Sequence, residues 1–285
     1  MPADPAPAVA VDGLVMRYGD KVAVDGLSLV VERATITAVL GPNGAGKTTT
    51  LETCEGYRRP QAGSVRVLGL DPVRDRRELL PRIGVMLQGG GAWSGVRAME
   101  MLDHVARLHA HPLDTAMLAD RLGLGDCGRT PYRRLSGGQQ QRLGLAMALV
   151  GRPEIVFVDE PTAGMDPQAR HTTWDLLREL REAGVTVVLT THYLDEAEQL
   201  ADQVHIIDRG RLVASGTPEE LTRGSSATVR LVVDKELPAE AEAALRASVD
   251  RWSVDHDVAV RSISFGSRTL EDVFLELTGR GLRHD

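Results

Sequence analysis

The sequence predicts an α/β protein with a mostly parallel β-sheet covered by helices. Two observations support this class. Short apolar runs alternate with helical patterns from residue 155 to residue 215, an order typical of parallel strands joined by helices. A glycine-rich loop also follows the β-branched run Thr35–Leu40 and precedes a predicted helix. The chain therefore contains a strand, loop and helix unit of the kind that binds phosphate.

The glycine-rich loop has the composition that phosphate binding requires. Glycine adopts backbone conformations closed to other residues, so that successive amide groups can converge on one anion. Lys47 adds a positive charge for the outer phosphates, and the Thr48 hydroxyl suits Mg²⁺, which prefers oxygen ligands. A chance glycine-rich turn is a poor alternative, because strand, Lys-Thr pair and helix all occur together. The predicted ligand is a nucleoside triphosphate with Mg²⁺, and the loop residues are Gly41, Pro42, Asn43, Gly44, Ala45, Gly46, Lys47, Thr48 and Thr49.

Around this loop the chain divides into regions of different character. Before and after it, short β-rich runs predict an antiparallel sheet that leads into the phosphate-loop strand. Residues 96–150 form a predicted helical insert, because apolar residues recur there at helical spacing. The predicted strands are Val9–Val15, Val22–Val31, Thr35–Leu40, Ser64–Leu68, Arg82–Leu87, Ile155–Val158, Val185–Thr190, Val204–Asp208 and Arg211–Ser215, and the predicted helices include Gly137–Val150, Asp166–Ala183 and Leu194–Ala201.

A second unit is predicted after residue 222, where a linker-like segment, residues 223–226, interrupts the pattern. We therefore expect a nucleotide-binding domain over residues 1–222 and a small α+β extension over residues 223–285. The extension is short enough that independent stability is not expected. Its predicted strands are Thr228–Val233, Trp252–Val254 and Val258–Ile263, and its predicted helices are Pro238–Ala247 and Leu270–Thr278.

Composition favours a soluble cytoplasmic protein. The chain is 42% hydrophobic, yet no apolar run approaches the roughly 18–20 residues that span a bilayer, and residues 1–9 lack the blocks of a signal peptide. The net charge of −7 argues against nucleic acid as a partner. Cys54 and Cys127 lack the spaced partners of a metal site, so we expect them to be packing thiols.

Two further segments carry groups that suit phosphate chemistry. Ser136 is a good N-cap for the helix that follows, and Gly137 and Gly138 leave its first amides open to an anion, although an ordinary cap explains them equally well. The apolar strand Ile155–Val158 delivers Asp159 and Glu160 to its carboxyl end, where α/β sheets hold ligands. Asp159 is expected to bind Mg²⁺ and Glu160 to act as general base, the alternative being a solvated acidic turn.

Residues 135–139 read Leu-Ser-Gly-Gly-Gln, and together with the phosphate loop they resemble the nucleotide-binding subunit of ATP-binding cassette (ABC) transporters. The resemblance covers about Val9–Leu221. It implies a P-loop ATPase core with a mixed sheet, an antiparallel β subdomain and a helical subdomain. It also implies a head-to-tail homodimer, in which Ser136, Gly137, Gly138 and Gln139 of each subunit close over the partner's ATP. The membrane-spanning permease would be a separate chain, with this subunit peripheral at the cytoplasmic face of the cell membrane.

The resemblance also implies individual roles. His192, which follows the strand Val185–Thr190, matches the switch histidine that contacts the γ-phosphate. Gln88 matches the residue that senses Mg²⁺ and water and links to the permease, with residues 88–110 forming the receiving surface. Tyr18 matches the aromatic that stacks on adenine, although strand packing explains it as well. Asp166 matches a dimer-contact loop and could equally cap the next helix.

The tail, residues 269–279, resembles the C-terminal segment of ATPases paired with ABC-2-type exporters of drugs, antibiotics and lipids. Export is therefore the preferred direction, with an importer ATPase as the alternative. A non-transport ABC ATPase is less favoured, because the chain lacks a second cassette and long coiled coils. A P-loop kinase or GTPase would lack the Leu-Ser-Gly-Gly-Gln segment. Nothing in the sequence identifies the transported substrate.

Overall fold

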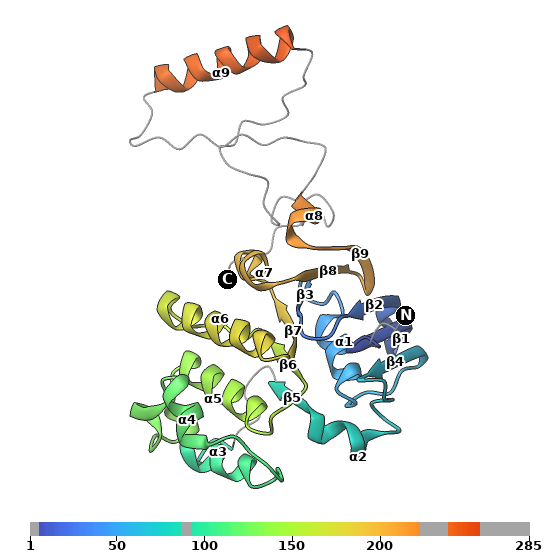
Figure 1. Ribbon diagram of the computed structural model, residues 1–285. Coiled ribbons are helices and arrows are strands. Elements are labelled where there is room, and N and C mark those ends of the chain that lie inside the picture. Colours follow the sequence, from blue (N-terminus) through green and yellow to red (C-terminus); the bar gives the residue numbers. More distant parts are fainter. Residues whose placement is uncertain (1–5, 87–92, 223–238, 257–285) are drawn as a thin grey trace.

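A computed structural model describes residues 6–86, 93–222 and 239–256 (Figure 1). Within these residues the chain forms two β-sheets and the helices that pack on them. Gln88 lies outside the described residues, as do the tail and most of the extension, so the predictions made for these positions stay predictions. No helix in the described ranges is long and apolar enough to cross a bilayer.

The larger sheet has six strands in the order β5-β6-β7-β3-β8-β9. The first five strands in this order run parallel, and β9 pairs antiparallel with β8. Because the middle strands are covered on both faces, they are continuous buried runs rather than alternating ones. The strands are β3 (Ile36–Leu40), β5 (Ile83–Met86), β6 (Ile155–Asp159), β7 (Thr186–Thr191), β8 (Gln203–Asp208) and β9 (Arg211–Gly216).

The smaller sheet is antiparallel, in the order β2-β1-β4, with β1 (Val9–Tyr18) at its centre between β2 (Lys21–Val31) and β4 (Ala62–Val67). Alternate side chains of β1 and β2 are buried in a core shared with one face of the larger sheet and with α1. The predicted antiparallel sheet is therefore confirmed. It leads into β3, which belongs to the other sheet.

The opposite face of the larger sheet is covered by a second core that includes the helical insert. Alternate residues of β3 are buried in different cores. Ile36, Ala38 and Leu40 pack in the core that contains the helical insert, whereas Val39 packs in the core with α1 and the smaller sheet. The helices are α1 (Lys47–Cys54), α2 (Arg76–Leu79), α3 (Ala98–Ala106), α4 (Thr115–Arg121), α5 (Gly137–Leu149), α6 (Pro167–Glu182), α7 (Leu194–Leu200), α8 (Pro218–Thr222) and α9 (Ala239–Asp255), with short 3-10 turns at Leu80–Arg82, Gly125–Cys127 and Tyr132–Arg134.

One predicted strand is wrong. Trp252–Val254 lies inside α9, which extends well beyond the predicted helix Pro238–Ala247. Trp252 stacks on His256, with ring centroids 4.8 Å apart. Residues four apart meet in this way on a helix, so the β preference of Trp252 and Val254 is overridden by the helix that precedes them.

Candidate active site

The glycine-rich loop connects the carboxyl end of β3 to α1, as predicted. A Cβ at Gly41 would lie 2.3 Å from the carbonyl oxygen of Ile207, and Gly46 has a φ of 104°, which disfavours any residue with a side chain. The amide of Gly210, in the turn between β8 and β9, donates to the Ala45 oxygen at 2.9 Å and anchors the loop. Glycine therefore lets the loop pack closely while it delivers the amino end of α1, where backbone amides favour an anion.

The remaining loop positions divide between packed and exposed. Ala45 is buried and its amide donates to the Pro42 oxygen at 3.1 Å, whereas Asn43 and Gly44 are exposed. The Thr49 carbonyl accepts a hydrogen bond from the Thr53 hydroxyl at 2.7 Å inside α1. The loop therefore presents its tip to solvent and holds its base against the sheet.

The Lys47 side chain turns back over this loop. Its ammonium donates to the carbonyl oxygens of Gly41 at 2.7 Å and Pro42 at 3.3 Å, and only 7% of the residue is exposed. Burial lowers the pKa of Lys47, while the nearby carboxylates Glu160 and Asp159 act in the opposite direction. The cation is thus held inside the loop, between the backbone and the carboxylates of β6.

Asp159 lies at the end of β6 and faces α1. One of its carboxylate oxygens is 3.4 Å from the Thr48 hydroxyl, and the other accepts a hydrogen bond from the Thr190 hydroxyl on β7. Burial raises the pKa of Asp159, and the Thr190 hydrogen bond opposes that shift. A hydroxyl beside a partly buried carboxylate fits Mg²⁺, which takes oxygen ligands and keeps several waters. The two residues that the sequence analysis assigns separately to Mg²⁺, Thr48 and Asp159, therefore lie next to each other.

Glu160 and His192 meet across the ends of two neighbouring strands. The Oε1 atom of Glu160 lies 3.1 Å from Nδ1 of His192, and both side chains are partly exposed. Glu160 has a φ of 50°, in the left-handed region that residues with a Cβ seldom adopt. Its amide donates to the Thr190 oxygen at 3.0 Å, which holds the turn against β7. The sequence expectation that His192 emerges at the same sheet edge as Glu160 is met.

The segment 136–139 begins α5 as an N-terminal cap. The Ser136 hydroxyl accepts from the Gln139 amide at 3.3 Å, and the Gln139 side chain accepts from the Ser136 amide at 2.9 Å. Ser136 and Gly137 are exposed, and a Cβ at Gly137 would meet nothing within 4 Å. No hydrogen bond in the described part of the chain joins this segment to the phosphate loop, and α5 and α1 lie apart in Figure 1.

Tyr18 lies at the end of β1, and Asp166 lies at the amino end of α6. Tyr18 ends β1 with 42% of its surface exposed, and the guanidinium of Arg58, which pairs with Glu52, lies over its ring at 5.0 Å. Asp166 caps α6 by accepting from the Ala169 amide at 2.9 Å. Tyr18 therefore offers an accessible ring rather than a packed one, and Asp166 serves at least as a helix cap.

Cys54 and Cys127 are free and buried, as expected of packing thiols. Burial raises the pKa of both thiols.

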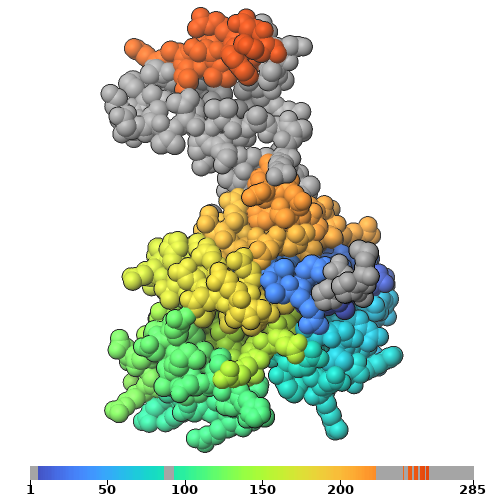
Figure 2. Space-filling model, in the orientation of Figure 1, coloured from blue at the N-terminus to red at the C-terminus, as the bar shows by residue number. Residues whose placement is uncertain are grey.

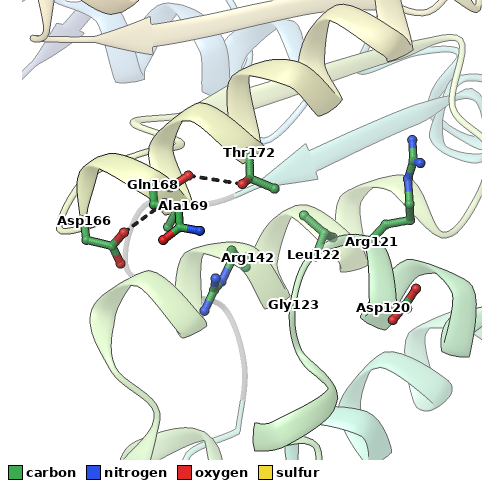
Figure 3. A pocket seen from close by; sticks show the side chains of 9 residues that line it. All are labelled: Asp120, Arg121, Leu122, Gly123, Arg142, Asp166, Gln168, Ala169 and Thr172. Carbon is green, nitrogen blue, oxygen red and sulfur yellow. Dashed lines mark hydrogen bonds between the residues drawn. The ribbon is translucent and has the colours of Figure 1, made fainter.

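A pocket of about 400 Å³ lies between α4, α5 and α6, where Arg142 faces the amino end of α6 (Figure 3). Its lining contains none of the predicted nucleotide or metal residues, so it is separate from the site described above.

Glu55 is a buried carboxyl group next to the site that the sequence analysis did not single out. It follows α1, is 5% exposed, and its Oε2 atom has no hydrogen-bond partner among the described residues. Burial, reinforced by Asp159 and Glu52, raises its pKa from 4.5 to about 8. No local sequence pattern marks this residue, because its burial depends on the packing of α1 between the two sheets.

Glu55 is expected to make stability depend on pH. The Glu55 carboxyl binds its proton more tightly in the folded protein than in the unfolded chain. Its contribution to the free energy of unfolding is therefore fully present below about pH 4.5 and is lost as the pH rises through about 8. Glu55→Gln removes this loss, and at pH 8.5 its apparent Tm should exceed the wild-type value by at least about 2 °C. The advantage should vanish at pH 5. Thermal unfolding from pH 5 to pH 8.5 tests this expectation, with Glu179→Gln as the control for an exposed carboxylate. A Tm difference between Glu55→Gln and the wild type that is the same at every pH would contradict the role of Glu55.

A phosphate loop facing a strand-end Asp-Glu pair occurs in many nucleotide hydrolases. The Leu-Ser-Gly-Gly-Gln cap of α5, in a helical insert apart from that loop, narrows the class to ATP-binding cassette ATPases. Comparison with known proteins agrees. The ABC transporter family matches residues 24–163, and the chain belongs to this family.

The relatives match along nearly the whole chain. The daunorubicin/doxorubicin resistance ATP-binding protein DrrA of Streptomyces peucetius is 38% identical over 98% of this chain and 94% of its own length. The Nod factor export ATP-binding protein I of Ralstonia nicotianae is 36% identical over 97% and 95%. A solved ATP-binding subunit of an ABC transporter superposes with a TM-score of 0.69 at 25% identity, covering 76% of this chain and 92% of that one. This chain is thus an ATP-hydrolysing subunit of the ABC transporter class.

Proposed function

We propose that this subunit powers a separate membrane permease that exports a drug, antibiotic or lipid, and that it works at the cytoplasmic face of the cell membrane. The proposal that the subunit hydrolyses ATP at this site rests on the contact of Glu160 with His192, next to Asp159 and the phosphate loop. The export direction is supported by the relatives, which are named for drug resistance and for Nod factor export.

Each residue of the site has a role that follows from its position. Lys47 exchanges the carbonyls of Gly41 and Pro42 for the outer phosphates of ATP. Thr48 and Asp159 hold Mg²⁺, which neutralises charge on the phosphates when bound. Gln88 is proposed to sense that ion and the water beside it. Tyr18 stacks on adenine through its exposed ring.

Hydrolysis needs a base on the attacking water and a donor on the γ-phosphate. Glu160 accepts a hydrogen bond from the water and takes its proton. His192 Nδ1 is within hydrogen-bond distance of Glu160, and we propose that the same ring also donates to the γ-phosphate. As the imidazole turns to the phosphate, the Glu160 carboxylate becomes free for the water. The pair thereby couples arrival of the nucleotide to activation of the base.

Two copies are proposed to complete each site. Ser136 and Gly137 are exposed residues at the start of α5, and neither makes a hydrogen bond to the phosphate loop of its own chain within the described residues. In a head-to-tail dimer they reach the nucleotide of the partner, so that Ser136, Gly137, Gly138 and Gln139 supply the second half of the site. ATP then acts as the contact between the subunits, and its hydrolysis releases them.

The permease is proposed to dock on residues 88–110. Within the described part of this range, Trp93 is 62% exposed and Leu108 is 73% exposed, although both are large and apolar. Trp93 lies beside His104, with ring centroids 5.4 Å apart. Exposed apolar side chains of this size are typical of interaction surfaces. Residues 223–285 are proposed to form the extension that accompanies exporter ATPases.

The proposal is tested with inside-out membrane vesicles that contain this full-length chain and the membrane protein that copurifies with it in detergent. With ATP and Mg²⁺, daunorubicin should accumulate inside the vesicles, since the cytoplasmic face is outermost. Lys47→Ala should abolish accumulation and most ATP affinity, because no other loop residue carries positive charge. ATP-driven loss of drug from loaded vesicles would indicate import, and the absence of any copurifying membrane protein would contradict the partner assignment.

A further inference from the structure

The segments that carry Glu160 and His192 are joined a second time behind the site. Thr162, two residues after Glu160, donates its hydroxyl to Oε1 of Glu196 at 2.8 Å, and Glu196 lies four residues after His192. Thr162 and Glu196 are fully buried, whereas Glu160 and His192 are partly exposed. The partly exposed pair Glu160 and His192 thus lies in front of the buried hydrogen-bonded pair Thr162 and Glu196.

The Glu196 carboxylate connects three elements. The same Oε1 atom also accepts from the indole N–H of Trp174, on α6, at 3.0 Å. Burial raises the pKa of Glu196, and hydrogen bonds from Thr191, Thr162 and Trp174 oppose that shift, as does the charge of Arg170. A buried carboxylate is costly unless it is hydrogen-bonded, and the hydrogen bonds from Thr162 and Trp174 offset part of the cost of burying Glu196.

The segment after His192 is also fixed against α6. The Arg170 guanidinium lies 4.5 Å from the ring centre of Tyr193 and 3.4 Å from the Asp195 carboxylate. The Tyr193 amide donates to the Thr191 hydroxyl at 2.9 Å. Through Arg170, α6 therefore holds the segment that follows His192, and Glu196 is a fixed point to which the turn that carries Glu160 is attached.

The position of Glu160, by contrast, depends on the turn formed by residues 160–165. The left-handed conformation of Glu160 persists only where the surroundings impose it. The Ala163 amide donates to the Glu160 oxygen at 3.2 Å, and the Met165 amide donates to the Thr162 oxygen at 3.2 Å. The side-chain bond of Thr162 ties this tight turn to Glu196 and hence to the His192 segment.

We infer that Glu196 is a positioning residue for hydrolysis, which holds Glu160 at its distance from His192 through the Thr162 hydroxyl. This inference rests on the proposed roles of Glu160 and His192. The two hydrogen bonds to Oε1 have different consequences, because the Thr162 bond leads to the base and the Trp174 bond leads only to α6. Small displacements of a reacting group are costly, since a shift of about 1 Å lowers a rate about 10²-fold.

The experiment compares variants of the full-length chain by kcat at saturating ATP and Mg²⁺, ATP affinity and Tm. Thr162→Val and Thr162→Ala both remove the hydroxyl and differ in volume, so an effect of the lost hydrogen bond is common to both. Thr162→Ser restores the hydroxyl. Trp174→Phe is the matched control, because it removes the other donor to the same oxygen and also leaves a cavity.

We expect Thr162→Val and Thr162→Ala to lower kcat about tenfold or more with ATP affinity within about twofold, and Thr162→Ser to recover most of the rate. Trp174→Phe should lower Tm at least as much while keeping kcat within about threefold of the wild type. A kcat that follows Tm across all four variants, or a folded Thr162→Val or Thr162→Ala with wild-type kcat, would overturn the inference. Glu160→Gln, measured in parallel, separates failure of the inference from failure of the proposed base.

Discussion

Glu160→Gln is expected to lower kcat by at least about tenfold, and by up to about 10⁴-fold, while ATP and Mg²⁺ still bind. The amide keeps the shape of the carboxylate but cannot take the proton of the attacking water. Lys47, Thr48 and Asp159, the residues proposed to bind the phosphates and Mg²⁺, are unchanged, so the loss should fall on the chemical step rather than on ground-state binding. The variant should accumulate as an ATP-bound dimer.

The measurement is steady-state hydrolysis together with nucleotide affinity and size-exclusion chromatography in ATP. Glu154→Gln is the matched control, because it makes the same substitution just before the start of β6, at the end of the strand away from the phosphate loop. The Glu154 carboxylate pairs with Arg82 at 2.6 Å. Wild-type turnover in purified Glu160→Gln, with Glu154→Gln equally active, would refute the assignment of Glu160 as the base.

Ser136→Arg is expected to abolish hydrolysis while ATP binding to an isolated subunit remains nearly intact. Ser136 is exposed and makes its hydrogen bonds within its own helix cap, so an arginine there should not reach the phosphate loop of its own chain. In the dimer, however, its bulk and charge would obstruct the site shared with the partner. Loss of the cap itself costs about 1 kcal/mol. Asp114→Ala, which removes the cap of α4, controls for that loss and should remain active.

Mixing Ser136→Arg with Lys47→Ala gives the decisive result. Each variant is inactive alone, but one site of the mixed dimer combines an intact phosphate loop with an intact Ser136 segment. Some activity should return on mixing, once ATP binding at one site per dimer has been verified. Absence of recovery despite that control, together with full activity in a monomer whose rate is independent of concentration, would refute the shared site.

Much of the site could be predicted from sequence because its signals are local. A phosphate loop needs glycines at fixed spacing, a lysine and a flanking strand and helix, and all of these lie within about fifteen consecutive residues. The pair Asp159 and Glu160 follows an apolar run, and buried parallel strands end at a common edge. The predicted sheet and the helical insert are confirmed for the same reason, since hydrophobic periodicity is written into each segment. Among the described residues, the contradicted element is Trp252–Val254, which was too short to carry such a signal.

The tertiary structure decided what depends on distant segments meeting. The order of the six strands puts β6 beside β7, and only that neighbour relation brings Glu160 to His192 and Thr190 to Asp159. Glu55 and Glu196 have no motif of their own, and they acquire shifted pKa values because helices and sheets close over them. The sequence by itself determined which residues can bind phosphate, hold Mg²⁺ and activate water, because those abilities belong to the side chains. The fold alone determined which of these groups touch and which are removed from water, because contact and burial are properties of packing.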